Sequence, residues 1–174
     1  QAEADRLCRN ASTTQKELAA FHDSLATHVF VDPACGSGNF LTVAYGRLRE
    51  IETQVIVELR RRRGTTGAMA LDATLETKVT IDQFHGIEIS WWPAKIAETA
   101  MFLIDHQANR KLALAVGDAP DRLPITITAH IHHANALEVD WSDIVPAAKA
   151  GGSTYVFGNP PFLGHDTRSD EQAA

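Results

Sequence analysis

The chain has 174 residues, a length that suits one domain with a sizeable hydrophobic core. Hydrophobic residues make up 44% and charged residues 22%, which is ordinary for a soluble globular domain, and no apolar run approaches the roughly 20 residues of a membrane span. The net charge of -6 shows no excess of the basic residues that grip nucleic acid, and two cysteines make no disulfide framework, so we expect a reducing cytoplasm.

The first third of the chain predicts a helix, a strand and a second, longer helix. Thr14 and Glu17 fit a capping box ahead of apolar residues at helical spacing. Residues 28–31 are a short β-branched and aromatic run that predicts the first strand. From Asn39 apolar residues recur every three or four positions, which predicts an amphipathic helix to about Arg63.

The rest of the chain continues the alternation of strands and helices. Ser90 is expected to cap a helix in which apolar residues share one face. The segment 111–123 is interpreted as a connector. The residues expected to share the face of the helix after Ser90 are Trp92, Ile96, Ala100 and Leu103. Strands are predicted at 84–88, 125–131 and 154–157, and a short helix around 141–150.

This order of elements implies an α/β fold, with a largely parallel sheet and helices on its faces. In such sheets ligands bind outside the carboxyl ends of the strands, near the point where the strand order reverses. Four polar residues lie at or just beyond a predicted strand end: Asp32, Glu88, Asn135 and Asn159.

Two motifs carry a resemblance to a known family. They are residues 31–40 (VDPACGSGNF) and 156–162 (VFGNPPF), and the second is followed by Leu163-Gly164, Arg168-Ser169 and Glu171-Gln172. The pair resembles S-adenosylmethionine-dependent DNA adenine-N6 methyltransferases, in particular the methyltransferase part of fused restriction–modification enzymes. The resemblance implies a Rossmann-like class I methyltransferase fold in a bacterial or archaeal cytoplasm.

The resemblance assigns the first motif to S-adenosylmethionine. Gly36 and Gly38 let the backbone turn tightly before a helix N-terminus, which favours negative charge such as the methionyl carboxylate. Asp32 is expected to hold the methionyl ammonium. The alternative is a plain glycine turn between strand and helix. The expected cofactor-binding residues are Asp32, Pro33, Ala34, Gly36, Gly38, Asn39, Phe40, Glu88, Ile89, Asn135 and Ala136.

The later strand ends complete the expected cofactor site. Glu88 is predicted to accept both ribose hydroxyls, with a cap of the following helix as the alternative. Asn135 matches the position that in this family contacts the cofactor's adenine, with an ordinary turn asparagine as the alternative. A nicotinamide dinucleotide site is disfavoured, because Leu41 stands where a third glycine is needed and Glu88 comes too late in the chain.

The second motif is predicted to be catalytic through Asn159, Pro160, Pro161 and Phe162. The side-chain oxygen of Asn159 and the carbonyl of Pro160 would accept the two hydrogens of an exocyclic amine, and Phe162 would stack on the base. Asn-Pro is also a common turn signal, which is the alternative.

Two further features are predicted not to act in catalysis. Cys35 has no partner base and is expected to be a small packed residue. No metal site is predicted from the nearby histidines (His130, His132 and His133), because no thiolate or carboxylate pattern completes one.

The division expected is an N-terminal helical segment at 1–27 and a partial catalytic domain at 28–174 that stops after about four strands. The target-recognition domain and any nuclease are expected to lie outside this chain, so DNA would be bound through regions missing from it. The basic run at 60–63 is interpreted as a solvated helix end. The alternatives are methylation of protein glutamine or RNA, or a cofactor-binding module inactive in isolation. Oligomeric state stays open.

Overall fold

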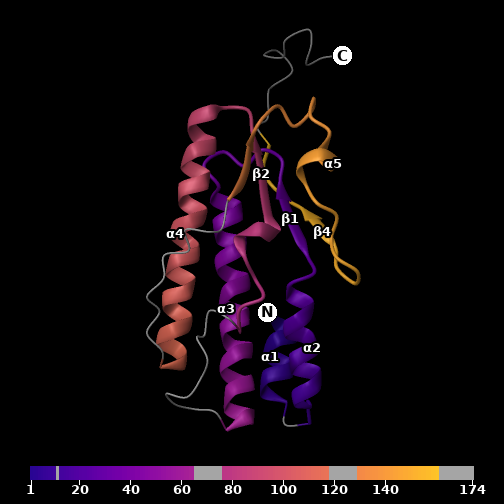
Figure 1. Cartoon of the computed structure of the whole chain (residues 1–174), viewed down its shortest axis with the longest axis vertical. Coiled ribbons are helices and arrows are strands. Elements are labelled where there is room, and N and C mark those ends of the chain that lie inside the picture. The colour runs from indigo at the N-terminus through magenta and orange to yellow at the C-terminus, as the bar shows by residue number, and fades with distance from the viewer. Residues whose placement is uncertain (11, 65–75, 118–128, 161–174) are drawn as a thin grey trace.

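The computed structural model describes residues 1–10, 12–64, 76–117 and 129–160 (Figure 1). Its centre is a sheet of four parallel strands in the order β3-β2-β1-β4. The strands are β1 (Val29–Asp32), β2 (Phe84–Glu88), β3 (His130–His133) and β4 (Thr154–Val156). The predicted α/β fold with a parallel sheet is therefore confirmed.

The strand order reverses beside β1. The chain passes from β1 to β2 and on to β3 in one direction, and then crosses back to place β4 on the other side of β1. The loops that follow β1 and β4 leave neighbouring strands in this reversal, which is where ligands bind in open α/β sheets.

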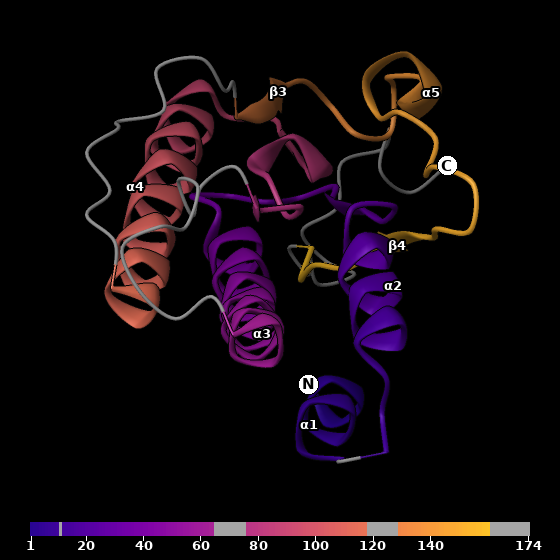
Figure 2. The ribbon, with the colours of Figure 1, turned by 60° about the horizontal axis from the view of Figure 1, so that its bottom comes forward.

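Two long helices, α3 (Asn39–Arg63) and α4 (Trp91–Val116), pack side by side on one face of the sheet (Figures 1 and 2). The helix α2 (Gln15–Leu25) packs against α3, and α1 (Ala2–Arg9) packs on both. Figure 2 shows α5 (Trp141–Ile144) on the side of the sheet away from α3 and α4. Among the described residues, no helix is both long and apolar enough to cross a bilayer.

The N-terminal helices follow from local signals of different strength. The capping box before α2 is confirmed, since the Glu17 N–H donates to Thr14 Oγ1 at 3.2 Å and the Thr14 N–H donates to Glu17 Oε2 at 2.7 Å. Helix α1 lies within the N-terminal helical segment predicted at 1–27, but its separation from α2 was not predicted. This short helix is held by packing, with Leu7 and Cys8 against a cluster that includes Leu18.

Aromatic rings cross three strands on the face of the sheet that α3 covers. Phe30 stacks on Phe84 with ring centroids 4.6 Å apart, and on Tyr155 with centroids 5.4 Å apart. Tyr45 of α3 meets the Phe84 ring edge-on. The parallel register pairs Phe30 with both neighbours, so the same three residues fix strand alignment and core packing.

The prediction of a connector at 111–123 is wrong for its first half. The helix α4 continues to Val116 because Leu112 and Ala113 are buried, with Leu112 packed against Ile56 of α3. It ends at Gly117, whose φ of 74° is the left-handed conformation usual at a helix C-terminus. Residues 118–123 lie outside the described residues.

Two other boundaries also differ from prediction. The third strand begins at His130 within the described residues, five positions later than predicted, and 125–128 lie outside them. The short helix α5 ends at Ile144, because Pro146 disfavours helical backbone at the residue before it, and Val145 is extended.

The face of α4 that packs is not the one with the largest side chains. Trp92, Ile96 and Leu103 do share a face with Ala100, as predicted, but the three large side chains are exposed. The buried face carries mainly small residues, which let α3 approach closely: Ala94, Ala97, Met101, Ala108 and Leu112.

Candidate functional site

The carboxyl ends of β1 and β2 hold the two candidate acids on either side of the glycine loop. Asp32 ends β1 and Glu88 ends β2. The loop closes onto β2 through two hydrogen bonds, from the Cys35 N–H to the Ile87 carbonyl at 3.0 Å and from the Gly36 N–H to Glu88 Oε2 at 2.9 Å. Asp32, Gly36 and Glu88, far apart in sequence, therefore lie together.

Asp32 is completely buried, and one of its carboxylate oxygens is unsatisfied. Its Oδ1 accepts the Ala34 N–H at 3.1 Å, while Oδ2 has no hydrogen-bond partner among the described residues. Burial raises the pKa of Asp32, and the Glu88 carboxylate adds a smaller upward effect against the lowering effect of the Ala34 hydrogen bond. A buried carboxylate with a free oxygen suits a cationic ligand group, which would relieve the cost of burial.

The glycine loop serves both the site and the helix packing. Gly36 and Gly38 have φ of 54° and 82°, a region that residues with a side chain rarely adopt. Gly38 directly precedes α3, and a Cβ there would lie 3.0 Å from the Cβ of Ala97 on α4. The first helical residues, Asn39 and Phe40, are exposed beside this loop.

Glu88 links the loop to the start of α4. Its Oε1 accepts the Ser90 N–H at 2.8 Å, while Oε2 holds Gly36. Glu88 therefore contacts Ser90, which occupies the N-cap position of α4 as predicted but makes no capping hydrogen bond with its side chain. Each oxygen keeps a lone pair with which it can accept a ligand hydroxyl. Ile89 and Trp91 are 64% and 52% exposed next to it, so both are available to cover a flat ring.

Asn135 uses its side chain within its own turn. The Leu137 N–H donates to Asn135 Oδ1 at 3.1 Å, and Asn135 Nδ2 donates to Glu138 Oε1 at 2.8 Å. The carbonyl of the next residue, Ala136, accepts the Trp141 indole N–H at 2.8 Å. The alternative of a turn asparagine is therefore realised, and contact with a cofactor would require these bonds to be exchanged.

The segment after β4 lies directly against Asp32. The Phe157 N–H donates to the Val31 carbonyl at 2.9 Å, which continues the β4–β1 pairing by one step. A Cβ built on Gly158 would lie 2.4 Å from Asp32 Oδ1. Asn159 and Pro160 follow and are exposed, while Pro161 and Phe162 lie outside the described residues.

Sequence reasoning missed the contact of Gly158 with Asp32. A glycine directly before Asn159 was the available signal, but nothing in the sequence identifies its partner. The half-buried Pro33 and Ala34 form the turn after β1, where only the Ala34 N–H contacts the candidate carboxylate.

Cys35 is a packing residue. It is 5% exposed, and a Cβ on Gly86 would lie 2.7 Å from its sulfur. Burial, assisted by the charges of Asp32 and Glu88, raises the pKa of the Cys35 thiol to about 12. The thiol therefore stays protonated at neutral pH, and it is no nucleophile.

The histidines of β3 form a ring stack with a partner that sequence reasoning missed. His85 of β2 is buried and stacks on His130 with centroids 4.9 Å apart, and His132 lies 6.4 Å from it. His133 turns elsewhere, toward the Ile89 carbonyl. In the part of the chain that the structure describes, no three histidines, cysteines or acids are placed to hold a metal ion.

The basic run at the end of α3 is partly solvated, as predicted, since Arg61 and Arg63 are exposed, but three of its arginines also pair with acids of the chain itself. Arg60 is buried and pairs with Glu76 at 3.2 Å. Arg61 and Arg62 both pair with Glu58, at 2.7 and 2.5 Å. These pairs neutralise much of the run's charge.

Comparison with known proteins gives consistent matches. Residues 8–174 match the family model described as MmeI, DNA-methyltransferase domain. DNA methyltransferase A of Bacillus subtilis (strain 168) is 37% identical over 143 residues, 82% of this chain. A solved structure of the Type IIL restriction-modification enzyme MmeI in complex with DNA matches 98% of this chain with a TM-score of 0.84 and 38% identity.

The chain spans only part of these relatives, 15% of the Bacillus protein and 21% of the solved MmeI chain. The match covers nearly all of this chain, its sheet and its two motifs. The resemblance to the methyltransferase part of restriction–modification enzymes is confirmed, and the chain belongs to the family of MmeI DNA-methyltransferase domains.

Proposed function

We propose that this chain is the catalytic core of an enzyme that transfers a methyl group from S-adenosylmethionine to the N6 amine of adenine in DNA. The observation that carries the proposal is the junction of Asp32, Glu88 and the Gly158-Asn159-Pro160 segment at one edge of the sheet. The larger protein would act in restriction–modification or phage defence, in a bacterial or archaeal cytoplasm.

The free oxygen of Asp32 fits the amino group of the cofactor, and this fit supports S-adenosylmethionine as the ligand. Asp32 would hold the methionyl ammonium, the amides at the start of α3 would face the carboxylate, and Glu88 would accept the ribose hydroxyls. Ile89, which is exposed beside Glu88, would cover the adenine. When bound, S-adenosylmethionine supplies an electrophilic methyl group on a sulfonium.

The Asn159 segment would orient the target amine. The Asn159 side-chain oxygen and the Pro160 carbonyl would each accept one hydrogen of the amine, so that its nitrogen lone pair turns toward the methyl group. Phe162 would stack on the flipped base. The nitrogen forms the new bond to carbon, the sulfur keeps the electron pair of the broken bond, and the amine releases one proton to solvent.

Calorimetric titration of S-adenosylmethionine into this chain tests the cofactor half of the proposal. We expect saturable binding that is weakened at least about ten-fold, but still measurable, in Asp32→Ala and in Glu88→Ala. A folded chain and a full-length protein that both fail to bind would overturn the proposal.

The substrate half is tested on the full-length protein with tritiated cofactor. Digestion of the methylated DNA to nucleosides should place the label in N6-methyladenine. Label in N4-methylcytosine, or in RNA or a glutamine-containing peptide offered in parallel, would assign a different acceptor. An Asn159→Ala variant that retains cofactor binding but not transfer would support the role of the second motif.

A further inference from the structure

The absence of a side chain at Gly158 is what allows the second motif to touch Asp32. A Cβ at this position would lie 2.4 Å from Oδ1, 3.1 Å from Cγ and 3.6 Å from Oδ2 of that carboxylate. Real Cβ atoms do not approach other atoms within 3.0 Å. Any residue with a side chain would therefore displace the Asp32 carboxylate or push the segment away from it.

Both partners are held by hydrogen bonds. Asp32 is completely buried, and its Oδ1 is tied to the Ala34 N–H. On the other side, the Phe157 N–H is bonded to the Val31 carbonyl, one residue before Asp32. The backbones of the two segments thus lie at the same edge of the sheet, and Gly158 packs directly against the Asp32 carboxylate.

We propose that Gly158 is a positioning residue, which sets the Asp32 carboxylate for the amino group of the cofactor and holds the Asn159 segment at a fixed offset from it. This inference rests on the proposed function. Gly158 itself contacts neither ligand. It acts through Asp32. A larger residue at position 158 should therefore lower the affinity only for ligands that carry the amino group.

The test compares two ligands in wild-type protein and Gly158→Ala. S-adenosylmethionine carries the amino acid portion, whereas 5′-methylthioadenosine has the adenosine and sulfur but lacks that portion. In the full-length protein we expect Gly158→Ala to weaken binding of S-adenosylmethionine about ten-fold or more, the usual size for loss of a charged hydrogen bond. Binding of 5′-methylthioadenosine should be unchanged.

A double-mutant cycle with Asp32→Ala makes the test independent of whether Gly158→Ala folds well. Asp32→Ala removes both the ammonium partner and the overlapping atoms. In that background Gly158→Ala should cause no further loss of S-adenosylmethionine affinity, and it should lower the melting temperature less than it does in wild type.

A matched control is Gly152→Ala at the other end of β4, where a Cβ would lie 2.0 Å from the Thr27 carbonyl oxygen. It should lower stability without changing the ratio of the two affinities. Equal weakening of both ligands by Gly158→Ala, or losses that simply add in the cycle, would overturn the inference. Wild-type protein that binds neither ligand would instead overturn the proposed function.

Discussion

The charge of Asp32 does not stabilise the fold, because the side chain is buried without a cationic partner among the described residues. Burial raises its pKa, so the folded protein disfavours the charged form. Such an arrangement is expected where a ligand, rather than the protein, completes the ion pair.

Asp32→Asn separates these two roles. Asparagine keeps an oxygen for the Ala34 N–H but loses the charge, so we expect the melting temperature at pH 7 to stay the same or rise. Affinity for S-adenosylmethionine should fall by about ten-fold to a hundred-fold, since a charged hydrogen bond contributes about 1.5–3 kcal/mol. Calorimetry and thermal unfolding measure the two effects. A variant that loses stability without losing affinity would make Asp32 a structural residue.

At the scale of an element, the start of α3 depends on Gly38. Alanine there would meet both a φ of 82° and the Cβ of Ala97 at 3.0 Å, whereas alanine at Gly64 would meet a φ of 70° and no atom of the described residues within 4 Å. We expect Gly38→Ala to cost about 2–3 kcal/mol of unfolding free energy and Gly64→Ala about 1 kcal/mol. Denaturant titrations of both variants give the difference, which reports the packing of α3 on α4. Equal losses of unfolding free energy in the two variants would mean that α4 shifts to accommodate the added methyl group at position 38.

The β2–β3 pair carries a pH dependence through His85. Burial, with smaller effects from His130 and His132, lowers the pKa of His85 from 6.5 to about 4, against a weak raising effect of Asp82. Between pH 6.5 and about 4, His85 is protonated in the unfolded chain but largely neutral in the folded chain. The free energy of unfolding therefore falls as the pH drops from about 6.5 to about 4.

His85→Phe keeps a ring for stacking and removes this titration. Over that pH interval the variant should lose less unfolding free energy than wild type, by about 1–3 kcal/mol. Urea unfolding at several pH values measures the two curves. Parallel curves would show that His85 titrates alike in the folded and unfolded states.

Local patterns predicted the elements wherever one signal dominated. The capping box, the period of α3 and the β-branched runs gave α2, α3, β1, β2 and β4 within one or two residues. The buried side of α4 was not predictable in the same way. Trp92, Ile96 and Leu103 lie on the surface, while the buried side combines alanines with Met101 and Leu112, because the close approach of two helices favours small residues.

The candidate site was predictable as a set of strand ends but not as a set of contacts. The rule for parallel sheets placed Asp32 and Glu88 at one edge, as found. The contact of Gly158 with Asp32 joins residues from distant parts of the sequence, and it depends on β4 lying next to β1. Sequence alone does not fix that adjacency.

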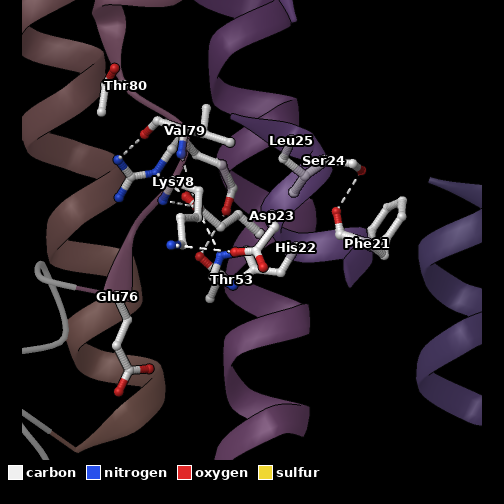
Figure 3. Close-up of polar contacts among 12 residues, drawn as sticks. Phe21, His22, Asp23, Ser24, Leu25, Thr53, Glu76, Lys78, Val79 and Thr80 are labelled. Atoms are coloured by element: carbon white, nitrogen blue, oxygen red, sulfur yellow. Dashed lines mark hydrogen bonds and ion pairs between the residues drawn. The ribbon is translucent and has the colours of Figure 1, made fainter. Parts of the chain in front are cut away.

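At the scale of the whole molecule, a buried ionic network joins α2 and α3 to the segment that leads into β2. Glu52 of α3 is 1% exposed, and its Oε1 accepts the backbone N–H groups of Lys78 and Val79 and contacts His22 Nε2 at 3.1 Å. Its Oε2 lies 3.2 Å from Arg49 Nε. Figure 3 shows His22 of α2 turned toward the segment that carries Lys78 and Val79.

Glu52→Ala should therefore destabilise the whole chain. The change leaves the buried Arg49 charge and two backbone donors without this partner, and we expect a loss of about 3–5 kcal/mol. Glu50→Ala, on the same helix, removes only exposed pairs with Arg47 and Lys111 and should cost less than about 1 kcal/mol. Chemical denaturation measures the unfolding free energy of both variants. Similar losses would mean that the buried network stabilises the fold no more than the exposed pairs do.

The charge of the molecule bears on what this chain does alone. Its net charge is -6, and three arginines of the basic run, Arg60 to Arg62, are paired with Glu58 and Glu76. Affinity for duplex DNA comes largely from basic side chains on phosphates. We therefore expect the 174-residue chain to transfer no label to DNA at about 150 mM salt, where exposed charges are screened beyond about 8 Å. The full-length protein, assayed in parallel, should transfer label, and robust turnover by the chain alone would show that its own surface suffices to hold DNA.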